Sequence, residues 1–521
     1  MISSFNPQDL VPLAPALALS VGAIVLLLSE VFLSASGTRG YQALLAVMFA
    51  GGAGFIAARN SNDSPREVFG GFGVHDPFGS VVTTLVCAAL VLAVLLAAGF
   101  LRHRNAERGE FYALMLFATA GMSLLALSAE LITLFVSLEV LSIATYALAA
   151  YLRRGPRPAE AGFKYFILGA FSSAVLLYGA ALLYGATGTT HIGLMAAPLR
   201  DAVASKPLLV YSALLLLSAG FAFKVSAVPF HIWTPDVYEG APTPVTALMS
   251  SGVKAAAFAS MVRVFLALAP ALPFEPVLAL FASLAAVTMV VGNVLAIPQR
   301  NVKRMLAYSS IAHAGYILVA VAALFAKPAS DATFRFLGAV SMGGTPTPAD
   351  VLRSDALQGI LFYLAAYMVT TIGAFGTLSA IERREDEDKG FAWDLERFAG
   401  LAERRPGWAA AMAVFMLSLG GIPPTFGFLG KLYVFRSAVD AGLVGLAIIG
   451  VLSSVVGAYY YLRVVVYMYM RPSPTGVQVP GRQWSTEVAL AVSAFAVVAM
   501  GVLPGPLSNW LERAGTLFGG R

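Results

Sequence analysis

The sequence predicts an all-α membrane protein with about 14 transmembrane helices. Three observations predict this fold class. First, 58% of the 521 residues are hydrophobic and only 12% are charged, whereas soluble domains contain about 45–50% apolar and about 25% charged residues. Second, mostly apolar stretches of about 20 residues, long enough to span a bilayer as helices, follow one another along the chain. Third, proline and glycine interrupt two of these stretches beside a lysine.

The predicted spans divide the chain into four parts. Residues 1–110 hold three spans, residues 111–270 and 271–470 hold five each, and residues 471–521 hold the last one. Only Ser128–Glu130 separates the fourth span from the fifth. In order, the spans are predicted near residues 10–33, 41–58, 78–101, 111–128, 130–152, 163–185, 208–230, 243–268, 275–297, 304–326, 357–381, 408–435, 441–470 and 485–510.

The distribution of lysine and arginine orients the bundle. One set of alternate connecting loops carries nearly twice as many of these residues as the other set, which includes the C-terminus. Because cytoplasmic loops of membrane proteins are enriched in lysine and arginine, we expect the first set to face the cytoplasm. Both termini are then expected on the non-cytoplasmic side.

The composition also excludes several classes of function. The net charge of +6 is explained by loop charge on a membrane protein, so no nucleic-acid partner is predicted. The single cysteine, Cys87, excludes a disulfide framework, a cysteine zinc site and a cysteine-ligated iron–sulfur cluster. The sequence contains no phosphate-binding loop, zinc-protease motif or dinucleotide fingerprint, so we expect no cofactor or metal in this chain.

Charged residues inside the predicted spans are the first candidates for function. Lys224, Lys254 and Lys431 lie deep within the seventh, eighth and twelfth spans. An ammonium group in hydrocarbon costs roughly 2.5–3.5 kcal/mol on insertion scales, so each of these lysines requires a reason to be there. Lysine can take up and release a proton, which arginine does not do readily. Three other cations lie nearer to span ends and are expected to reach the interface: Lys164, Arg263 and Arg463.

Glu139 is the acidic residue inside the fifth span. A carboxylate at this depth must face protein or water, and we expect it to be paired with a cation or protonated. Lys224 lies beside a helix break at Pro229, and the carbonyls freed by the break can stabilise a cation. Lys224 is also a candidate counter-ion for Glu139. A structural ion pair and a proton-transfer site are both consistent with this pattern.

Further candidates lie in the tenth span and in one loop. His313 follows Ser309 and Ser310 by about one turn. Histidine exchanges protons near neutral pH and hydroxyl groups relay them, although both residue types also serve in helix packing. Both interpretations stay open for His313. The acidic run 382–389 is expected to be a solvated loop or, alternatively, a docking surface.

The two interrupted spans have related patterns. Lys224 precedes its break, whereas Lys431 follows the break formed by residues 420–424. The seventh span is expected to enter from the non-cytoplasmic side and the twelfth from the cytoplasmic side, so both lysines lie beyond their breaks in the same direction. This arrangement is typical of an inverted-topology repeat, which predicts that spans four to eight and nine to thirteen are related.

Three segments are similar to a known family. They are FKVSAVPFHIWTPDVYEGAPTPVTALMSSGVKAAAF (residues 223–258), GNVLAIPQRNVKRMLAYSSIAHAGY (292–316) and LSLGGIPPTFGFLGKLYVF (417–435). They resemble the antiporter-like membrane subunits of respiratory complex I, the bacterial NADH–quinone oxidoreductase, over roughly residues 110–470. The chain ends soon after its fourteenth span, which favours the N and M types of this family over the L type.

The resemblance implies fourteen membrane helices, two inverted five-helix repeats and breaks in helices seven and twelve. It implies that the proton path contains Glu139, Lys224, Lys254 and Lys431, with His313 as a further candidate, and Lys431 agrees with the N type. NADH, FMN, iron–sulfur clusters and quinone are implied in partner subunits, with no cofactor in this chain. The implied partners are an antiporter-like subunit of the M type, small membrane subunits and the lipid bilayer of the cell inner membrane.

The sequence therefore predicts a proton-translocating, non-redox subunit of an NADH–quinone oxidoreductase. We expect that Lys224 loses a stabilising partner and releases its proton when Glu139 moves away. The proton is then expected to pass through Lys254 and intervening water to Lys431, with His313 as a further candidate on the path. The alternatives are a subunit of a multi-subunit Na+/H+ antiporter, a membrane-bound hydrogenase subunit with the same fold, and a non-conducting scaffold whose buried charges fix helix packing.

Overall fold

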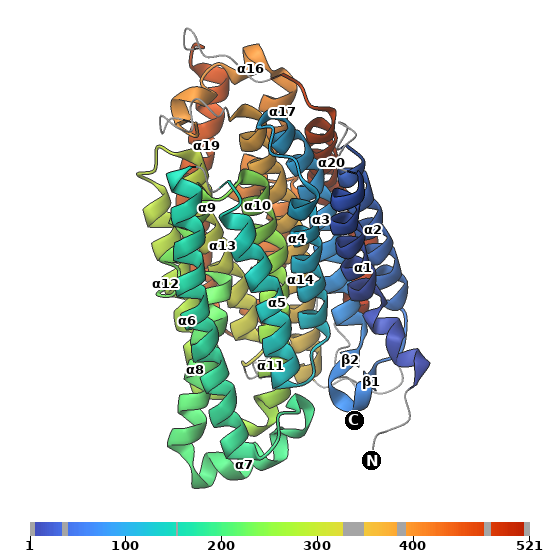
Figure 1. Ribbon diagram of the computed structural model, residues 1–521. Coiled ribbons are helices and arrows are strands. Elements are labelled where there is room, and N and C mark those ends of the chain that lie inside the picture. Colours follow the sequence, from blue (N-terminus) through green and yellow to red (C-terminus); the bar gives the residue numbers. More distant parts are fainter. Residues whose placement is uncertain are drawn as a thin grey trace.

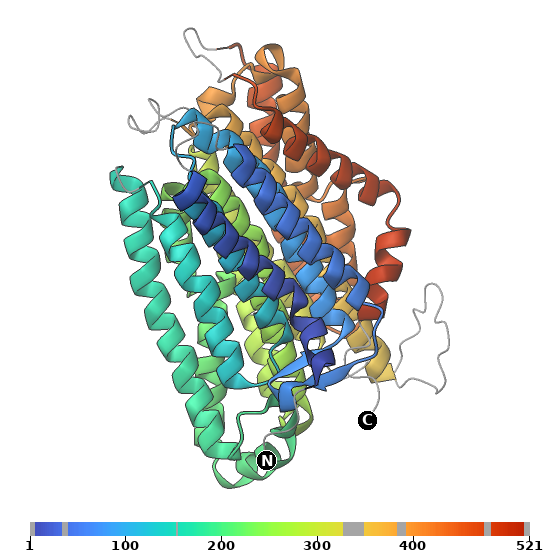
Figure 2. The same cartoon turned by 45° about the vertical axis from the view of Figure 1, so that its right-hand side comes forward.

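A computed structural model shows a bundle of long helices that run side by side (Figures 1 and 2). The structure describes residues 6–33, 40–152, 155–326, 348–382, 392–473 and 481–514. Within these ranges, thirteen helices are long and apolar enough to cross a membrane by length and composition. The predicted all-α membrane fold is therefore confirmed.

The N-terminal part contains three long helices and a small hairpin. Its elements are η1 (Pro7–Asp9), α1 (Leu10–Leu33), α2 (Gly40–Asn60), β1 (Arg66–Val68), β2 (Gly73–His75) and α3 (Pro77–His103). The two strands pair antiparallel, with Arg66 opposite His75. This hairpin was not predicted, because strands of three residues show no clear alternation of apolar and polar residues. Helix α3 begins at Pro77 because the Asp76 carboxylate accepts the backbone N–H of Gly79 at 2.7 Å.

The next five helices precede the first break. They are α4 (Gly109–Leu127), α5 (Leu131–Ala149), α6 (Pro156–Thr187), α7 (Ala196–Ser205) and α8 (Pro207–Val225). The tight connection between α4 and α5 is confirmed, and Glu130 caps α5 by accepting the N–H of Thr133 at 2.8 Å. The short helix α7 was not predicted and lies at the lower end of the bundle in Figure 1.

The predicted eighth span is one long helix that is interrupted by a π-helical turn. After α9 (Trp233–Gly240), the chain forms α10 (Thr243–Leu248), a π-helical turn (Met249–Val253) and α11 (Lys254–Leu268). A π-turn inserts one extra residue into the helix and is frequent at functional sites. Lys254 is the first residue after this turn.

The part of the chain from α12 to α19 contains the two most buried long helices of the bundle. Its elements are α12 (Phe274–Ala296), α13 (Val302–Ala323), α14 (Pro348–Ile381), α16 (Leu401–Arg404), α17 (Pro406–Gly420), α18 (Phe426–Asp440) and α19 (Val444–Met470). Helices α13 and α14 are buried almost along their whole length, whereas α12 and α19 expose broad apolar faces. Most polar side chains of α13 and α14 therefore lie in the interior.

The C-terminal part differs from the prediction. Helix α20 (Trp484–Val502) ends before Pro504, which cannot continue it, and a separate helix, α21 (Gly505–Ala514), follows. The predicted span 485–510 was therefore too long. Trp510 of α21 donates a hydrogen bond of 3.0 Å to Ser61, just after α2. The last described helix thus packs at the same end of the bundle as η1, as expected for an even number of spans.

The two predicted breaks are confirmed. Helix α8 ends at Val225, Ser226 adopts a left-handed conformation (φ 64°), and α9 begins at Trp233. Helix α17 ends at Gly420, Gly421 has φ 77°, and α18 begins at Phe426. The helices α17 and α18 together form the predicted twelfth span. The grouping of helices into two inverted repeats stays a prediction.

Candidate functional site

Lys224 lies in the last turn of α8, directly before the first break, and its side chain is buried. Its Nζ donates to Ser142 Oγ at 2.8 Å and to the hydroxyl of Tyr146 at 3.3 Å, both on α5. On the far side of the break, the Trp233 indole donates to the carbonyl of Phe223 at 3.1 Å. A side chain of α9 therefore satisfies a backbone carbonyl in the last turn of α8, and two hydroxyl groups accept hydrogen bonds from the lysine.

Glu139 lies one turn of α5 before Ser142, and its Oε1 is buried without a hydrogen-bond partner in the described structure. The carboxylate acts electrostatically on Lys224, but no ion pair within 4.0 Å joins them among the described residues. The expected direct pair is thus not formed in this conformation. The physical reason is that the ammonium group of Lys224 lies beside the turn of α5 that carries Ser142 and Tyr146. The hydroxyl groups of these two residues accept its hydrogen bonds in place of the carboxylate.

Lys254 is fully buried at the start of α11 and contacts α13. Its Nζ donates to the carbonyl of Ser310 at 2.7 Å and to Ser310 Oγ at 2.5 Å. The ring centroid of Tyr367 lies 5.8 Å from this nitrogen. Ser250 and Ser251 instead donate to the carbonyl of Ala247 within their own helix. Ser310 is therefore the hydroxyl partner of Lys254.

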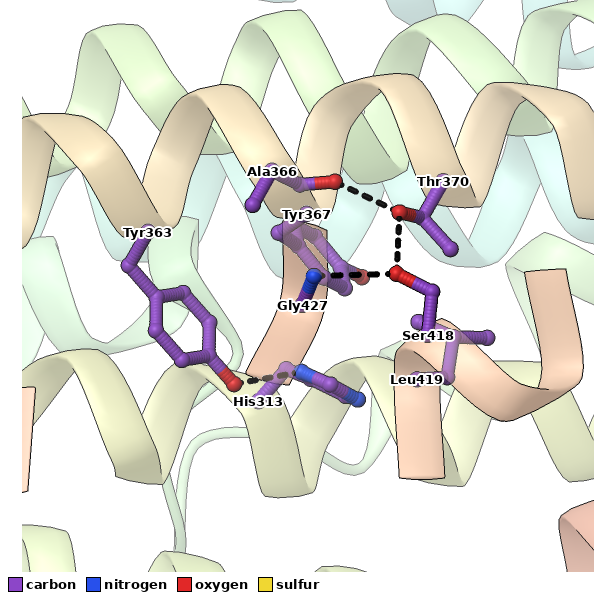
Figure 3. Close-up of a pocket in the computed structure, with 8 residues that line it drawn as sticks. All are labelled: His313, Tyr363, Ala366, Tyr367, Thr370, Ser418, Leu419 and Gly427. Carbon is purple, nitrogen blue, oxygen red and sulfur yellow. Dashed lines mark hydrogen bonds between the residues drawn. The ribbon is translucent and has the colours of Figure 1, made fainter. Parts of the chain in front are cut away.

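His313 lies one turn further along α13 and is hydrogen-bonded on both sides of its ring. Figure 3 shows the bond to Tyr363. Its Nδ1 is 2.6 Å from the hydroxyl of Tyr363 on α14, and its Nε2 is 3.0 Å from the hydroxyl of Tyr461 on α19. A cavity of about 10 Å³ adjoins the ring, which is room for about one water molecule.

Lys431 lies in the second turn of α18, beyond the second break. Its Nζ donates to the carbonyl of Leu419 at 2.8 Å and to Ser454 Oγ at 2.7 Å. The ring centroid of Tyr316 lies 5.0 Å from the same nitrogen. The cation is thus held by the end of α17, a hydroxyl and an aromatic face.

Helix α13 joins these groups. Ser310, His313 and Tyr316 follow one another at intervals of three residues, which places them on one side of the helix. This side meets Lys254 at one end and Lys431 at the other. The structure therefore brings Lys254, His313 and Lys431 together along α13. Lys224 of α8 and Glu139 of α5 lie apart from them, where Lys224 is hydrogen-bonded to α5.

Of the three cations expected at the interface, Arg263 is buried, whereas Lys164 and Arg463 are partly exposed and also bound to protein groups. Arg263 is 3% exposed and forms a two-bond ion pair with Asp76 at 2.7 and 3.0 Å. Lys164 pairs with Asp236 at 2.9 Å. Arg463 donates to two backbone carbonyls that follow α12. The prediction was wrong for Arg263 because its partner is far away in the sequence.

Asp236 of α9 holds the half-helix after the first break. It accepts hydrogen bonds from Lys164 of α6 at 2.9 Å and from Arg304 of α13 at 2.8 Å. Partial burial alone would raise the pKa of the Asp236 carboxyl, but the hydrogen bonds and charges of Lys164 and Arg304 outweigh it and hold this pKa below its ordinary value. This carboxylate therefore stays ionised at neutral pH.

The acidic run was only partly predicted. Glu382 is buried after α14 and accepts hydrogen bonds from Thr243 (2.6 Å), Trp393 (2.6 Å) and Arg104 (3.1 Å). The expectation of a solvated loop was wrong for this residue, because donors from three separate segments surround it. Positions 383–389 lie outside the described residues.

The chemical capacity of this interior is proton transfer through side chains and water. In the ranges that the structure describes, no group of three or more His, Cys, Asp or Glu side chains could hold a metal ion. The lysines, the histidine and the neighbouring hydroxyls are all groups that accept or donate protons. Each of the three lysines and His313 is hydrogen-bonded to at least one hydroxyl group.

Sequence reasoning missed the hydroxyl partners of the predicted residues. Ser142 and Tyr146 were recognisable in principle, because they follow Glu139 at helical spacing. No local signal pointed to Ser454, Tyr363 or Tyr461, which come from distant helices. Their positions follow from the packing of α14 and α19 against α13 and α18.

The comparisons with known proteins identify the family. The family described as NADH:quinone oxidoreductase/Mrp antiporter, TM, matches residues 128–342 and 349–457. The NADH-quinone oxidoreductase subunit N of Myxococcus xanthus is 65% identical over 518 residues, with 99% of each chain covered. This chain belongs to the antiporter-like subunit family. Its similarity to a subunit N from Trichlorobacter lovleyi is 41% identity, with 98% of each chain covered.

Solved structures share the antiporter-like fold. A chain of respiratory complex I from Thermus thermophilus is 34% identical, with a TM-score of 0.76 and coverage of 96% of this chain and 99% of that chain. A chain of the Mrp complex from Dietzia sp. has a TM-score of 0.78 over 97% of both chains, but at 21% identity it shows the fold alone. The region matched by the family includes all five predicted residues: Glu139, Lys224, Lys254, His313 and Lys431.

Proposed function

We propose that this chain is the N-type, proton-translocating membrane subunit of an NADH–quinone oxidoreductase. The observation that carries the proposal is that Lys224, Lys254 and Lys431 are buried without a carboxylate partner within the described residues. Each is at most 6% exposed, and among the described contacts each donates to hydroxyl or backbone carbonyl oxygens without an ion-paired carboxylate. A buried ammonium group without an anionic partner is costly, so these lysines are suited to losing and regaining a proton.

The first step involves Lys224. With the Glu139 carboxylate close, the charged form of the lysine is stabilised; with the carboxylate withdrawn, only Ser142 and Tyr146 hold the ammonium group. The described conformation, in which Glu139 makes no direct pair, corresponds to the state in which Lys224 is ready to release its proton.

The later steps follow α13. A proton from Lys224 reaches Lys254 through water and then passes by Ser310 and His313 toward Lys431. Lys431 lies beyond the second break, in the half-helix that continues toward the end of the bundle where α21 packs. Release from Lys431 to the non-cytoplasmic side completes one transfer in this proposal.

The remaining parts of the proposal concern the assembly. The subunit itself is non-redox: NADH, FMN, iron–sulfur clusters and quinone belong to partner subunits, and quinone reduction elsewhere in the complex supplies the energy. Its neighbours are an M-type antiporter-like subunit and small membrane subunits. It resides in the cell inner membrane with both termini on the non-cytoplasmic side, and residues 111–270 and 271–470 form the two inverted repeats.

The Na+/H+ antiporter and hydrogenase alternatives are not favoured. The full-length relatives with 65% and 41% identity are named NADH-quinone oxidoreductase subunit N, whereas the Mrp chain is 21% identical. A test of sodium dependence separates them: proton uptake by the purified complex should require NADH and quinone and should not change when sodium is replaced by potassium.

The decisive test is Lys224→Arg in the complete complex. Arginine keeps the positive charge but does not release its proton readily, so NADH-driven proton uptake into vesicles should fall at least about tenfold while the subunit still assembles. Lys206→Arg, an exposed lysine at the start of the same helix, is the matched control and should pump like the unmodified complex. Unchanged proton uptake in Lys224→Arg would overturn the proposal.

A further inference from the structure

A continuous chain of hydroxyl and imidazole groups crosses the centre of the bundle. Ser309 of α13 is hydrogen-bonded to the hydroxyl of Tyr461 of α19, and the same hydroxyl lies 3.0 Å from His313 Nε2. On the other side of the ring, His313 Nδ1 lies 2.6 Å from the hydroxyl of Tyr363 of α14. All four side chains are at most 3% exposed.

Each end of this chain meets a component of the proposed proton path. Ser309 precedes Ser310, which receives both hydrogen bonds from Lys254. Tyr363 packs against Gly430, so closely that a Cβ atom there would be 3.3 Å from its ring, and Gly430 precedes Lys431. The chain therefore lies between the two lysines, with one end next to the serine that binds Lys254 and the other end packed beside the residue that precedes Lys431.

The hydrogens of these groups can be placed in two ways that keep every hydrogen bond of the chain. A neutral imidazole carries one N–H and one acceptor nitrogen, and each hydroxyl carries one hydrogen. In the first arrangement, Ser309 donates to Tyr461, Tyr461 donates to Nε2 of His313, and Nδ1 donates to Tyr363. In the second arrangement, every one of these hydrogen bonds is reversed. The two arrangements have the same number of hydrogen bonds and differ in direction.

We propose that Tyr461 and Tyr363 are proton-relay residues, which load and unload His313 between Lys254 and Lys431. This inference rests on the proposed function and adds two relay groups to it. No oxidation or reduction is involved, because only protons change partners.

The transfer balances atom by atom. A proton arriving at Ser309 displaces the serine hydrogen to the oxygen of Tyr461, and Tyr461 passes its own hydrogen to Nε2 of His313. Nδ1 then gives its hydrogen to the oxygen of Tyr363, and Tyr363 releases its hydrogen to the adjacent cavity. Each bond formed to hydrogen is matched by one broken, and the chain is left in the second arrangement. The hydroxyls then rotate, and the imidazole loses its Nε2 hydrogen to water and takes up one hydrogen from water at Nδ1, so that the number of hydrogens is unchanged and the first arrangement is restored.

The cavity provides the next acceptor. Its wall includes His313, Tyr363, Tyr367 and Thr370, which Figure 3 shows around the imidazole. The hydroxyl of Tyr367 is buried with no hydrogen-bond partner in the described structure. A water molecule in this space would have polar partners on several sides, which is the condition for a stable buried water. It would carry the proton from Tyr363 toward α18.

The test uses Tyr461→Phe, Tyr363→Phe and the double variant in the purified complex, reconstituted in vesicles. NADH-driven proton uptake should fall at least about fivefold in each single variant, because phenylalanine keeps the ring but removes the transferable hydrogen. Since both hydroxyls act in series, the double variant should be no slower than the slower single variant. Tyr112→Phe, which removes a buried hydroxyl bonded to Glu107 at 2.9 Å far from this chain, is the control.

The outcomes are distinguishable. Wild-type uptake in both single variants, together with loss of uptake in Lys254→Met, would overturn the relay and leave the proposed function standing. Wild-type uptake in Lys254→Met would overturn the proposed function itself. Losses that multiply in the double variant would show two separate packing defects and would also overturn the relay. Subunit content of each complex is measured first, and Ser309→Ala gives a third test of the chain if one tyrosine variant fails to assemble.

Discussion

Lys431 donates a hydrogen bond of 2.8 Å to the carbonyl of Leu419, which lies in the last turn of α17 across the helix break. The carbonyls at the end of a helix carry partial negative charge and have no partner within the helix. Ser454 adds a second acceptor at 2.7 Å. The break therefore supplies acceptors that take the place of a carboxylate, and they hold the ammonium group without the strong attraction of a full negative charge.

Gly421 gives a direct test of this arrangement. It has φ 77°, and a Cβ atom at this position would lie 2.8 Å from Lys431 Cδ and 3.1 Å from its Nζ. Gly421→Ala should therefore displace Lys431 and lower NADH-driven proton uptake at least about threefold. Gly442→Ala is the matched control, because Gly442 has φ 75° but no atom within 4 Å of its Cβ position. Equal uptake in the two variants would show that the lysine position does not matter.

The buried pair of Arg263 and Asp76 should be important for stability. The side chains are 3% and 1% exposed, and the guanidinium also donates to the carbonyl of Ala126 at 2.8 Å. Asp76→Asn keeps the helix cap but leaves a buried cation without an anion, which costs about 3–5 kcal/mol. The thermal unfolding temperature, Tm, of the purified complex should fall clearly. The control Glu487→Gln breaks a pair whose side chains are 67% and 36% exposed and should cost less than about 1 kcal/mol. A similar loss in both variants would contradict the prediction.

The positions of the helices and of the three buried lysines could be predicted from the sequence because the signals are local. Runs of apolar residues determine the spans, and proline and glycine within a run determine the breaks. Lys224, Lys254 and Lys431 stand out because a charge within such a run is rare. These features depend on residues within about one helix of each other.

The partners of these charges could not be predicted, because they depend on packing between distant helices. Asp76 is 187 positions from Arg263, and Tyr461 is 148 positions from His313. Neither distance leaves a periodic pattern in the sequence. The same reason explains why Glu382 was expected in solvent: its donors come from segments that only the folded bundle brings together.

Glu382 should stabilise the end of α14. Its carboxylate accepts hydrogen bonds from Trp393, Thr243 and Arg104. Glu382→Gln removes the charge and one acceptor oxygen, so the stability of this region should fall by about 1–3 kcal/mol. We expect a lower Tm of the complex and a change in the Trp393 contribution to tryptophan emission. Glu403→Gln, at an exposed position with the same chemical change, should leave both unchanged; an unchanged Tm in Glu382→Gln would contradict the assigned role.

Asp236 should make the protein sensitive to acid. Lys164 and Arg304 hold the pKa of its carboxyl below the ordinary value, which is about 3.9 in an unfolded chain. A group whose pKa is lowered by folding contributes stability that is fully present above the unfolded pKa and is lost as the pH falls through the folded pKa. The difference in Tm between the unmodified complex and Asp236→Asn should therefore be constant from about pH 5 to 8. Below about pH 4 this difference should shrink, because the wild-type carboxyl becomes protonated and resembles the amide. Asp63→Asn, an exposed carboxyl paired with His75, is the comparison for a surface group. A difference in Tm for Asp236→Asn that grows as the pH falls would show that the carboxylate destabilises the half-helix α9, contrary to this account.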